Sequence, residues 1–381
     1  MENTILENRA WIDETWEKLD QKLRLVAVRS REKLPYTAVN GVHDDRSTTD
    51  VTWWTNGFWG GMMWLMYEAT GWDGYRITAQ RSEELLNPAM ADFDALHHDV
   101  GFMWHLTSGA NYRLTGDQAA RTRNLFAAST LASRYNVRGD YIQAWNGEAQ
   151  LGYSIIDCLM NLPLLYWASD ELEAPRFRDV AVRHIEMALR DHIRPDGSTN
   201  HIVDHFTDRP GVNQILGGQG YSPESCWSRG LSWAVYGMIL AYIHLGDERY
   251  LEAARRTADY FLEQVAKTDY LPLLDFAAPA QPVYYDSTAG VCAACGILEL
   301  AKYVPQEDAR YYTREALRIL QAICKEFCDF APERDAIVLM GSERYPFNDY
   351  GFRGLHIPII YGDFFFVEAL SKLRGSKFLI W

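Results

Sequence analysis

Six runs of mostly apolar residues, each long enough for a helix, alternate with amphipathic stretches along the 381-residue chain. A helix that is apolar on all sides is usually buried, whereas one with a single apolar stripe lies at a surface. The alternation therefore predicts an all-α fold, a closed ring of six helical hairpins with apolar helices inside and amphipathic helices outside. The uneven spacing disfavours a solenoid. The runs begin near residues 55, 99, 157, 229, 286 and 361.

The connecting segments predict little other regular structure. Residues 1–30 have the spacing of an amphipathic helix, and the polar segment 31–52 predicts a loop. Patterns typical of strands are scarce and predict only small β-hairpins in the loops before inner helices; the candidates are residues 141–145, 199–203 and 336–340. No Pro- or Ser-rich linker divides the chain, so we expect one domain covering residues 1–381.

Most of the apolar runs begin with a polar or aromatic side chain. Asp157 lies near the start of the run 154–168, where burying a carboxylate is costly unless it is paired or used. Other runs carry Asp99, Asp286, Asp363, Trp54 and Arg229 at their starts. This recurrence predicts that six helix starts face one pocket. Helix capping and the helix dipole explain such residues equally well, and for Asp99 and Asp157 both interpretations stay open.

Charge and composition exclude some classes of partner. The net charge of −14 argues against nucleic acid and anionic membranes, and an anionic small molecule would need a local Arg or Lys. We see no signal peptide and no apolar run long enough to span a bilayer, so we expect a cytoplasmic protein.

The cysteines and histidines do not form a recognisable metal motif. Cys292 and Cys295 have helical spacing within an apolar run, which predicts buried free thiols rather than a zinc site. No H-E-x-x-H pattern is present, and we expect no metal at these residues. The histidines that stand near the predicted pocket are read as hydrogen-bonded structural residues, with two-His metal binding as the alternative: His97, His98, His201 and His205.

Aromatic and polar residues near the predicted pocket favour a carbohydrate ligand, because ring faces suit the C–H faces of sugars. The tryptophans are Trp54, Trp145, Trp227 and Trp233. The glycine-rich segment that contains Gly217 and Gln219 allows close backbone approach, and Arg229 after it can bind a carboxylate or form a salt bridge. If Asp99 and Asp157 lie close together, repulsion and burial leave a protonated acid beside an anion, which suits proton transfer to a sugar.

Several motifs in this order resemble the unsaturated glucuronyl hydrolases, glycoside hydrolase family 88. The resemblance runs from about Trp53 to Leu370 and rests on the motifs His97-His-Asp-Val-Gly-Phe102, Ile142-Gln-Ala-Trp145, Ile155-Ile-Asp-Cys-Leu-Met-Asn-Leu-Pro-Leu-Leu165, Gly218-Gln-Gly220, Trp227-Ser-Arg-Gly-Leu-Ser-Trp233 and Tyr361-Gly-Asp-Phe-Phe-Phe366.

This resemblance implies an (α/α)6 barrel and an enzyme that hydrates the C4=C5 double bond of an unsaturated uronate, releasing the partner sugar from lyase-generated glycosaminoglycan disaccharides. It implies proton transfer by Asp157 and an essential second carboxylate, Asp99. Implied substrate contacts are Trp54, Trp145, His201, Gly217, Gln219, Trp227, Arg229 and Trp233. We expect a monomer or weak homodimer without a cofactor.

The segment 341–353 departs from the family pattern and leaves the partner sugar, its linkage and its sulfation open. The nearest alternative is an unsaturated rhamnogalacturonyl hydrolase acting on pectin fragments. Two alternatives of other classes are an N-acyl-sugar epimerase, in which histidines would carry the protons, and a non-catalytic sugar-binding protein, which would survive loss of both aspartates.

Overall fold

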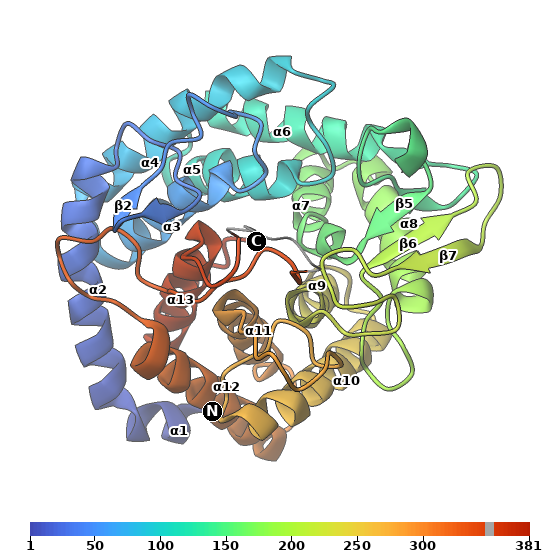
Figure 1. Cartoon of the computed structure of the whole chain (residues 1–381). Helices are drawn as coiled ribbons and strands as arrows, with labels where there is room; N and C mark the ends of the chain where they lie inside the picture. Colours follow the sequence, from blue (N-terminus) through green and yellow to red (C-terminus); the bar gives the residue numbers. More distant parts are fainter. Residues whose placement is uncertain (347–353) are drawn as a thin grey trace.

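A computed structural model of the chain describes residues 1–346 and 354–381, and helices dominate it (Figure 1). Six helical segments form an inner ring: α3 (Asn56–Thr70), η2 with α5 (Gly101–Gly109 and Ala110–Thr115), η4 with α7 (Ile156–Met160 and Pro163–Leu172), α9 (Ser228–Leu245), α11 (Ser287–Leu300) and α13 (Ile360–Leu373). Six helices surround them: α2 (Arg9–Arg29), α4 (Asp73–Leu86), α6 (Gln118–Ser133), α8 (Arg176–Asp191), α10 (Glu248–Val265) and α12 (Gln306–Phe327). The predicted (α/α)6 architecture is confirmed.

The division into inner and outer helices follows the apolar pattern. All residues of α11 and α13 are buried, whereas α10 and α12 bury one face and expose charged side chains on the other. A fully apolar helix is stable only when neighbours cover every side, so these segments must lie inside. Four short helices fill connections: α1 (Glu2–Glu7), η1 (Asn87–Ala91), η3 (Glu148–Gln150) and η5 (Ala266–Thr268).

The ring closes in a way that the sequence order does not show. α13 packs against both α11 and α3, which joins the last inner helix to the first. Its outer neighbour is α2, from the other end of the chain, and α2 also contacts α4. The sixth pair is therefore not a consecutive hairpin, which corrects the prediction of six hairpins at this point.

The strands are short and antiparallel. β3 (Tyr135–Asn136) pairs with β4 (Tyr141–Ile142), and β6 (Ile202–His205) lies between β5 (Tyr153–Ile155) and β7 (Val212–Leu216). These pairs agree with two of the three predicted sites.

Two predictions about strands were wrong. Residues 336–340 form no hairpin; Val338 makes a single bridge to Cys328. Residues 31–52, expected to be loop throughout, contain β1 (Ala38–Val39) paired with β2 (Val42–His43). Strands of two residues give too short an alternation to be recognised in the sequence.

The run 154–168 is not one helix, contrary to its apolar pattern. Its first residues belong to β5, Asp157 lies in the short 3₁₀ turn η4, and α7 begins only at Pro163. Proline lacks the N–H that a helix interior needs but fits the first helical position, so Pro163 sets this boundary. As a result, Asp157 lies on a tight turn ahead of the helix.

Other features of the core agree with the sequence. Cys292 and Cys295 are free and fully buried, as predicted, and the remaining four cysteines are also free thiols. None of the helices in the described part of the chain combines the length and apolarity needed to cross a membrane. The C-terminal residue, Trp381, is buried, and the C-terminus lies near the middle of the ring in Figure 1.

Candidate active site

A cavity of about 300 Å³ opens where several inner segments begin. It brings together six of the predicted site residues: Trp54, Asp99, Trp145, Asp157, Gln219 and Arg229. Residues from the segments around Tyr36 and Glu343 also line it. Residues more than 300 positions apart in the chain, such as Tyr36 and Glu343, therefore meet in one pocket.

Asp99 is held as an anion by its neighbours. Its carboxylate contacts His98 Nε2 at 3.1 Å and His97 Nδ1 at 3.4 Å, and it accepts a hydrogen bond from Asn161 Nδ2 at 3.2 Å. Burial alone would raise the pKa of Asp99, but the histidines and the amide outweigh it and lower the pKa below its ordinary value. His98 Nδ1 lies 2.9 Å from the carbonyl oxygen of Ala144, which turns Nε2 toward the carboxylate.

Asp157 has the opposite character. It is nearly fully buried, and its Oδ1 has no hydrogen-bond partner among the described residues; the nearest cationic or imidazole nitrogen is His201 Nε2 at 3.8 Å. Burial, followed by the negative charge of Asp99, raises the pKa of Asp157 to about 7. The two carboxylates thus differ strongly in proton affinity, the condition in which one is an acid and the other an anion near neutral pH.

His201 is a neutral imidazole with a defined tautomer. The backbone N–H of Gln219 donates to His201 Nδ1 at 2.9 Å, which leaves the ring proton on Nε2, facing Asp157. Burial lowers the pKa of His201 to about 3. Gly218 has φ +58°, and a Cβ there would lie 2.3 Å from His201 Nδ1, so only glycine permits this approach. The carbonyl of Gly217 lies 3.2 Å from the same nitrogen.

The tryptophans occupy two layers. Trp54 and Trp145 line the cavity, and Trp54 stacks on Tyr361 with ring centroids 5.3 Å apart. Trp227 is buried behind the cavity, 4.2 Å from the His201 ring. Trp233 is fully buried and packs on Phe102 and Phe365.

Neither Trp227 nor Trp233 is among the residues that line the cavity, and the direct substrate contacts expected of them stay predictions. Both are buried in the layer that supports the cavity wall. His201, which is buried, and Gly217, which is half-buried, also lie next to the lining residues rather than among them.

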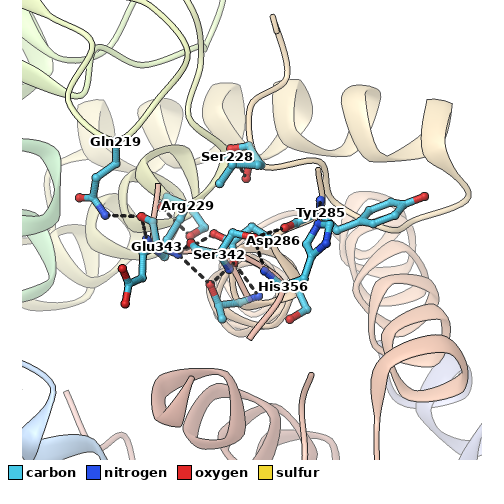
Figure 2. A network of polar contacts seen from close by, with 12 residues as sticks. Gln219, Ser228, Arg229, Tyr285, Asp286, Ser342, Glu343 and His356 are labelled. Atoms are coloured by element: carbon cyan, nitrogen blue, oxygen red, sulfur yellow. Dashed lines mark hydrogen bonds and ion pairs between the residues drawn. The ribbon is translucent and has the colours of Figure 1, made fainter. Parts of the chain in front are cut away.

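Arg229 is the centre of a polar network that forms one wall of the cavity (Figure 2). Its Nη1 donates to Asp286 Oδ2 and to the carbonyl of Ser342, both at 2.6 Å, and its Nη2 donates to the carbonyl of Glu343 at 2.8 Å. Gln219 Nε2 donates to the same Glu343 carbonyl at 2.6 Å. The guanidinium therefore forms the salt bridge considered as the alternative, and it holds residues 342–343 in place.

Asp286 and Asp363 do not reach the cavity, which corrects the prediction that all six helix starts point into it. Asp286 is fully buried, caps α11 by accepting from the Thr288 N–H, and pairs with Arg229. The Asp363 carboxylate accepts the backbone N–H groups of Ile337 and Val338 instead. Asp286 and Asp363 therefore hold the local backbone in place, as the alternative of helix capping and hydrogen bonding would have it, rather than facing a ligand.

Sequence reasoning missed part of the lining. Tyr36 and Trp53 contribute from the predicted loop and its end, and Glu343 and Arg344 from the segment before residues 347–353, which lie outside the described residues. Tyr36 Oη hydrogen-bonds to Glu343 Oε1 across the cavity wall. Tyr361 also lines the cavity. Two features of the sequence could have pointed to these lining residues: the motif that begins at Tyr361, and the departure of segment 341–353 from the family pattern.

One group in the described part of the chain has the spacing of a metal site. His97, His98 and Asp99 offer ligand atoms within 4.8 Å of one another. His98 Nε2 already contacts Asp99, so an ion there would compete with this pair. The arrangement suits acid–base chemistry directly: a buried acid, an anion and aromatic walls around a sugar-sized cavity.

Comparisons with known proteins agree with this geometry. Residues 28–267 match the model of Glycosyl Hydrolase Family 88. The chain is 36% identical to the unsaturated glucuronyl hydrolase of Bacillus sp. (strain GL1), over 87% of this chain and 89% of that protein. It is 33% identical to the unsaturated chondroitin disaccharide hydrolase of Streptococcus pneumoniae, over 87% and 84%.

Solved structures extend the likeness to the fold. The Bacillus sp. GL1 enzyme, described as responsible for the degradation of glycosaminoglycan, superposes with a TM-score of 0.87 at 31% identity, covering 94% of this chain and 97% of that one. A mutant unsaturated glucuronyl hydrolase from Streptococcus agalactiae complexed with dGlcA-GalNAc6S has a TM-score of 0.80 at 26% identity, covering 97% and 94%.

Proposed function

The chain belongs to glycosyl hydrolase family 88, and on that basis we propose that it is an unsaturated glucuronyl hydrolase that uses Asp157 and Asp99 to hydrate the unsaturated uronate of lyase-generated glycosaminoglycan disaccharides. The observation that carries the assignment of roles is the contrast within the carboxylate pair. The pKa of Asp157 is raised to about 7, while that of Asp99 is lowered. The relatives named above act on, or bind, such unsaturated sugars according to their names.

The reaction can be written for these two groups. Protonated Asp157 donates its proton to C4 of the enol ether, and positive charge develops at C5 and the ring oxygen. Ionised Asp99 stabilises this charge. Asp157, now a carboxylate, takes a proton from a water molecule whose oxygen bonds to C5, and the hemiketal that forms opens to release the partner sugar. Asp157 ends the cycle protonated, so no net proton is consumed.

The cavity walls supply binding. Trp54 and Trp145 offer ring faces to the sugars, and Gln219 presents its side chain at the cavity beside them. Arg229 lines the cavity while paired with Asp286, and Arg344 is a second cation on the same wall. We assign the uronate carboxylate to this wall. Trp227, Trp233, His201 and Gly217 support the lining residues.

The substrate class is tested by loss of ultraviolet absorbance from a panel of unsaturated chondroitin, hyaluronan, heparin and pectin disaccharides, since only hydration removes the conjugated double bond. We expect turnover of glycosaminoglycan disaccharides and little turnover of the pectin one.

Asp157→Asn and Asp99→Asn are the matched controls: each should lower kcat by several orders of magnitude, because an amide cannot exchange the proton or carry the charge. Substantial turnover by Asp157→Asn would refute the assigned role.

Two further expectations belong to this proposal. We propose a cytoplasmic enzyme, supported by six unpaired cysteines, because disulfides are rare in reducing compartments. Fractionation of the native cells tests this. We also propose a monomer or weak homodimer that works without a cofactor or metal, which light scattering and elemental analysis of the purified protein would check.

A further inference from the structure

Asn161 connects the two segments that carry the carboxylates. It is fully buried and follows the η4 turn that holds Asp157. Its Nδ2 donates to Asp99 Oδ1 at 3.2 Å and lies 3.4 Å from the backbone carbonyl oxygen of Asp157. One amide group therefore touches the side chain of one carboxylate residue and the backbone of the other.

The orientation of this amide is fixed by a third contact. The backbone N–H of Phe102, at the start of η2, donates to Asn161 Oδ1 at 2.8 Å. A backbone N–H can only donate, so the atom that faces it must be the amide oxygen, and the NH₂ group must face Asp99. The hydrogen bond from Phe102 therefore fixes the orientation of the Asn161 amide, with its NH₂ group toward Asp99.

The neighbouring backbone has been shaped to accommodate this amide. A Cβ at Gly101 would lie 2.5 Å from Asn161 Oδ1 and 2.9 Å from its Cα. Only glycine lets η2 begin this close to Asn161. Asp99, which accepts the hydrogen bond from Asn161, lies two residues before Gly101 in the chain.

The charge of Asp99 gives the amide its chemical effect. Burial acts against the ionised form of Asp99, and His98 and His97 are the larger influences that favour it; the N–H donated by Asn161 adds to theirs. Among residues 1–346 and 354–381, Asp157 has no such donor on its buried Oδ1. We propose that Asn161 is a positioning residue that locks the two carboxylate-bearing segments together and, with His98 and His97, helps to keep Asp99 the ionised member of the pair. The expected effect of Asn161 on turnover rests on the proposed function. Its expected effect on the ionisation of Asp99 does not.

The test replaces Asn161 with Leu, which has nearly the same shape but no donor, and with Ser as a smaller variant in case Leu prevents folding. In protein labelled with ¹³C at aspartate carboxyls, the resonance that disappears in Asp99→Asn reports the ionisation of Asp99 without substrate. We expect its midpoint to move to higher pH in both variants, because each loses the amide donor to the carboxylate. The acid limb of kcat/KM should rise by the same amount, while the alkaline limb, set by Asp157, stays near its wild-type position.

Asn124→Leu is the matched control. Asn124 is also fully buried and contacts η2, through His105 Nδ1 at 3.2 Å, and this hydrogen-bond partner is not a carboxylate. The Asn124→Leu variant should lose stability without moving either limb of the pH profile of kcat/KM.

If Asn161→Leu and Asn161→Ser lower stability or kcat but leave the Asp99 titration unchanged, Asn161 is only a packing residue and the inference is wrong. Failure of the wild-type enzyme to act on any unsaturated disaccharide would refute the function, while the carboxyl titration would still decide the role of Asn161.

Discussion

At the scale of single residues, the protonation state of Asp157 links catalysis to stability. Folding raises the pKa of this carboxyl from 3.8 to about 7. Below pH 3.8 the group is protonated in both the folded and the unfolded chain, so it costs nothing. As the pH rises toward 7, the unfolded chain gains stability by ionising while the folded one stays protonated, and the cost to folding grows until it levels off above pH 7.

Asp157→Asn removes this cost, because an amide stays neutral. We expect the variant to be more stable than the wild type by roughly 4 kcal/mol at pH 8, at about 1.36 kcal/mol per pKa unit. The difference should shrink toward zero near pH 4. Urea unfolding at the two pH values measures it, and an equal difference at both would contradict the raised pKa.

At the scale of elements, the turn between β7 and α9 places His201 against Asp157. Gly218→Ala should lower kcat/KM by tenfold or more, because the new Cβ displaces the His201 ring. Gly246→Ala is the matched control, since Gly246 has φ +70° and no neighbour within 4 Å of an added Cβ. Both variants should lose about 1 kcal/mol of stability from the left-handed backbone. Similar kinetics for the two would show that His201 is not held by this turn.

The Arg229–Asp286 pair joins α9 and α11 to the wall at residues 342–343. Arg229→Met leaves Asp286 as a buried anion and should cost about 3–5 kcal/mol of stability, with a large rise in KM. Adding Asp286→Asn removes that anion and should restore part of the stability without restoring KM. Calorimetry and steady-state kinetics on both variants test this. A double variant no more stable than the single one would show that the pair is not the source of the loss.

At the scale of the whole molecule, the C-terminal residue closes the middle of the ring. Trp381 stacks on Phe365 with an angle of 9° between the rings, and its Nε1 donates to Glu368 at 3.1 Å. Trp381→Ala should cost about 3–5 kcal/mol by opening a cavity. Phe93→Ala, at a residue that is 74% exposed, should cost less than about 0.5 kcal/mol. If the chain is one domain, as predicted, urea should unfold Trp381→Ala in a single transition at a lower midpoint; two separate transitions would contradict this.

The inner helices were predictable because their signal is local. A run such as 287–300 is apolar on every side, and no arrangement other than burial among neighbours satisfies it. The site residues Asp99, Asp157, Trp54 and Trp145 could be proposed from their position at the starts of apolar runs and from the family motifs. The strand β5 and the turn η4 could not, because an apolar run fits a strand, a turn or a helix until Pro163 and the pairing with β6 decide between them.

The sequence by itself determined the ring of helices, the free buried thiols and part of the set of residues from which the pocket is built, because helical periodicity and apolar content act over a few turns of chain. Only the tertiary structure decided what those residues do. Arg229 meets Asp286 from 57 positions away and Ser342 from 113, and Asn161 meets Asp99 from 62. A charge has a function only in relation to its partners and its distance from water, and no local pattern contains those distances.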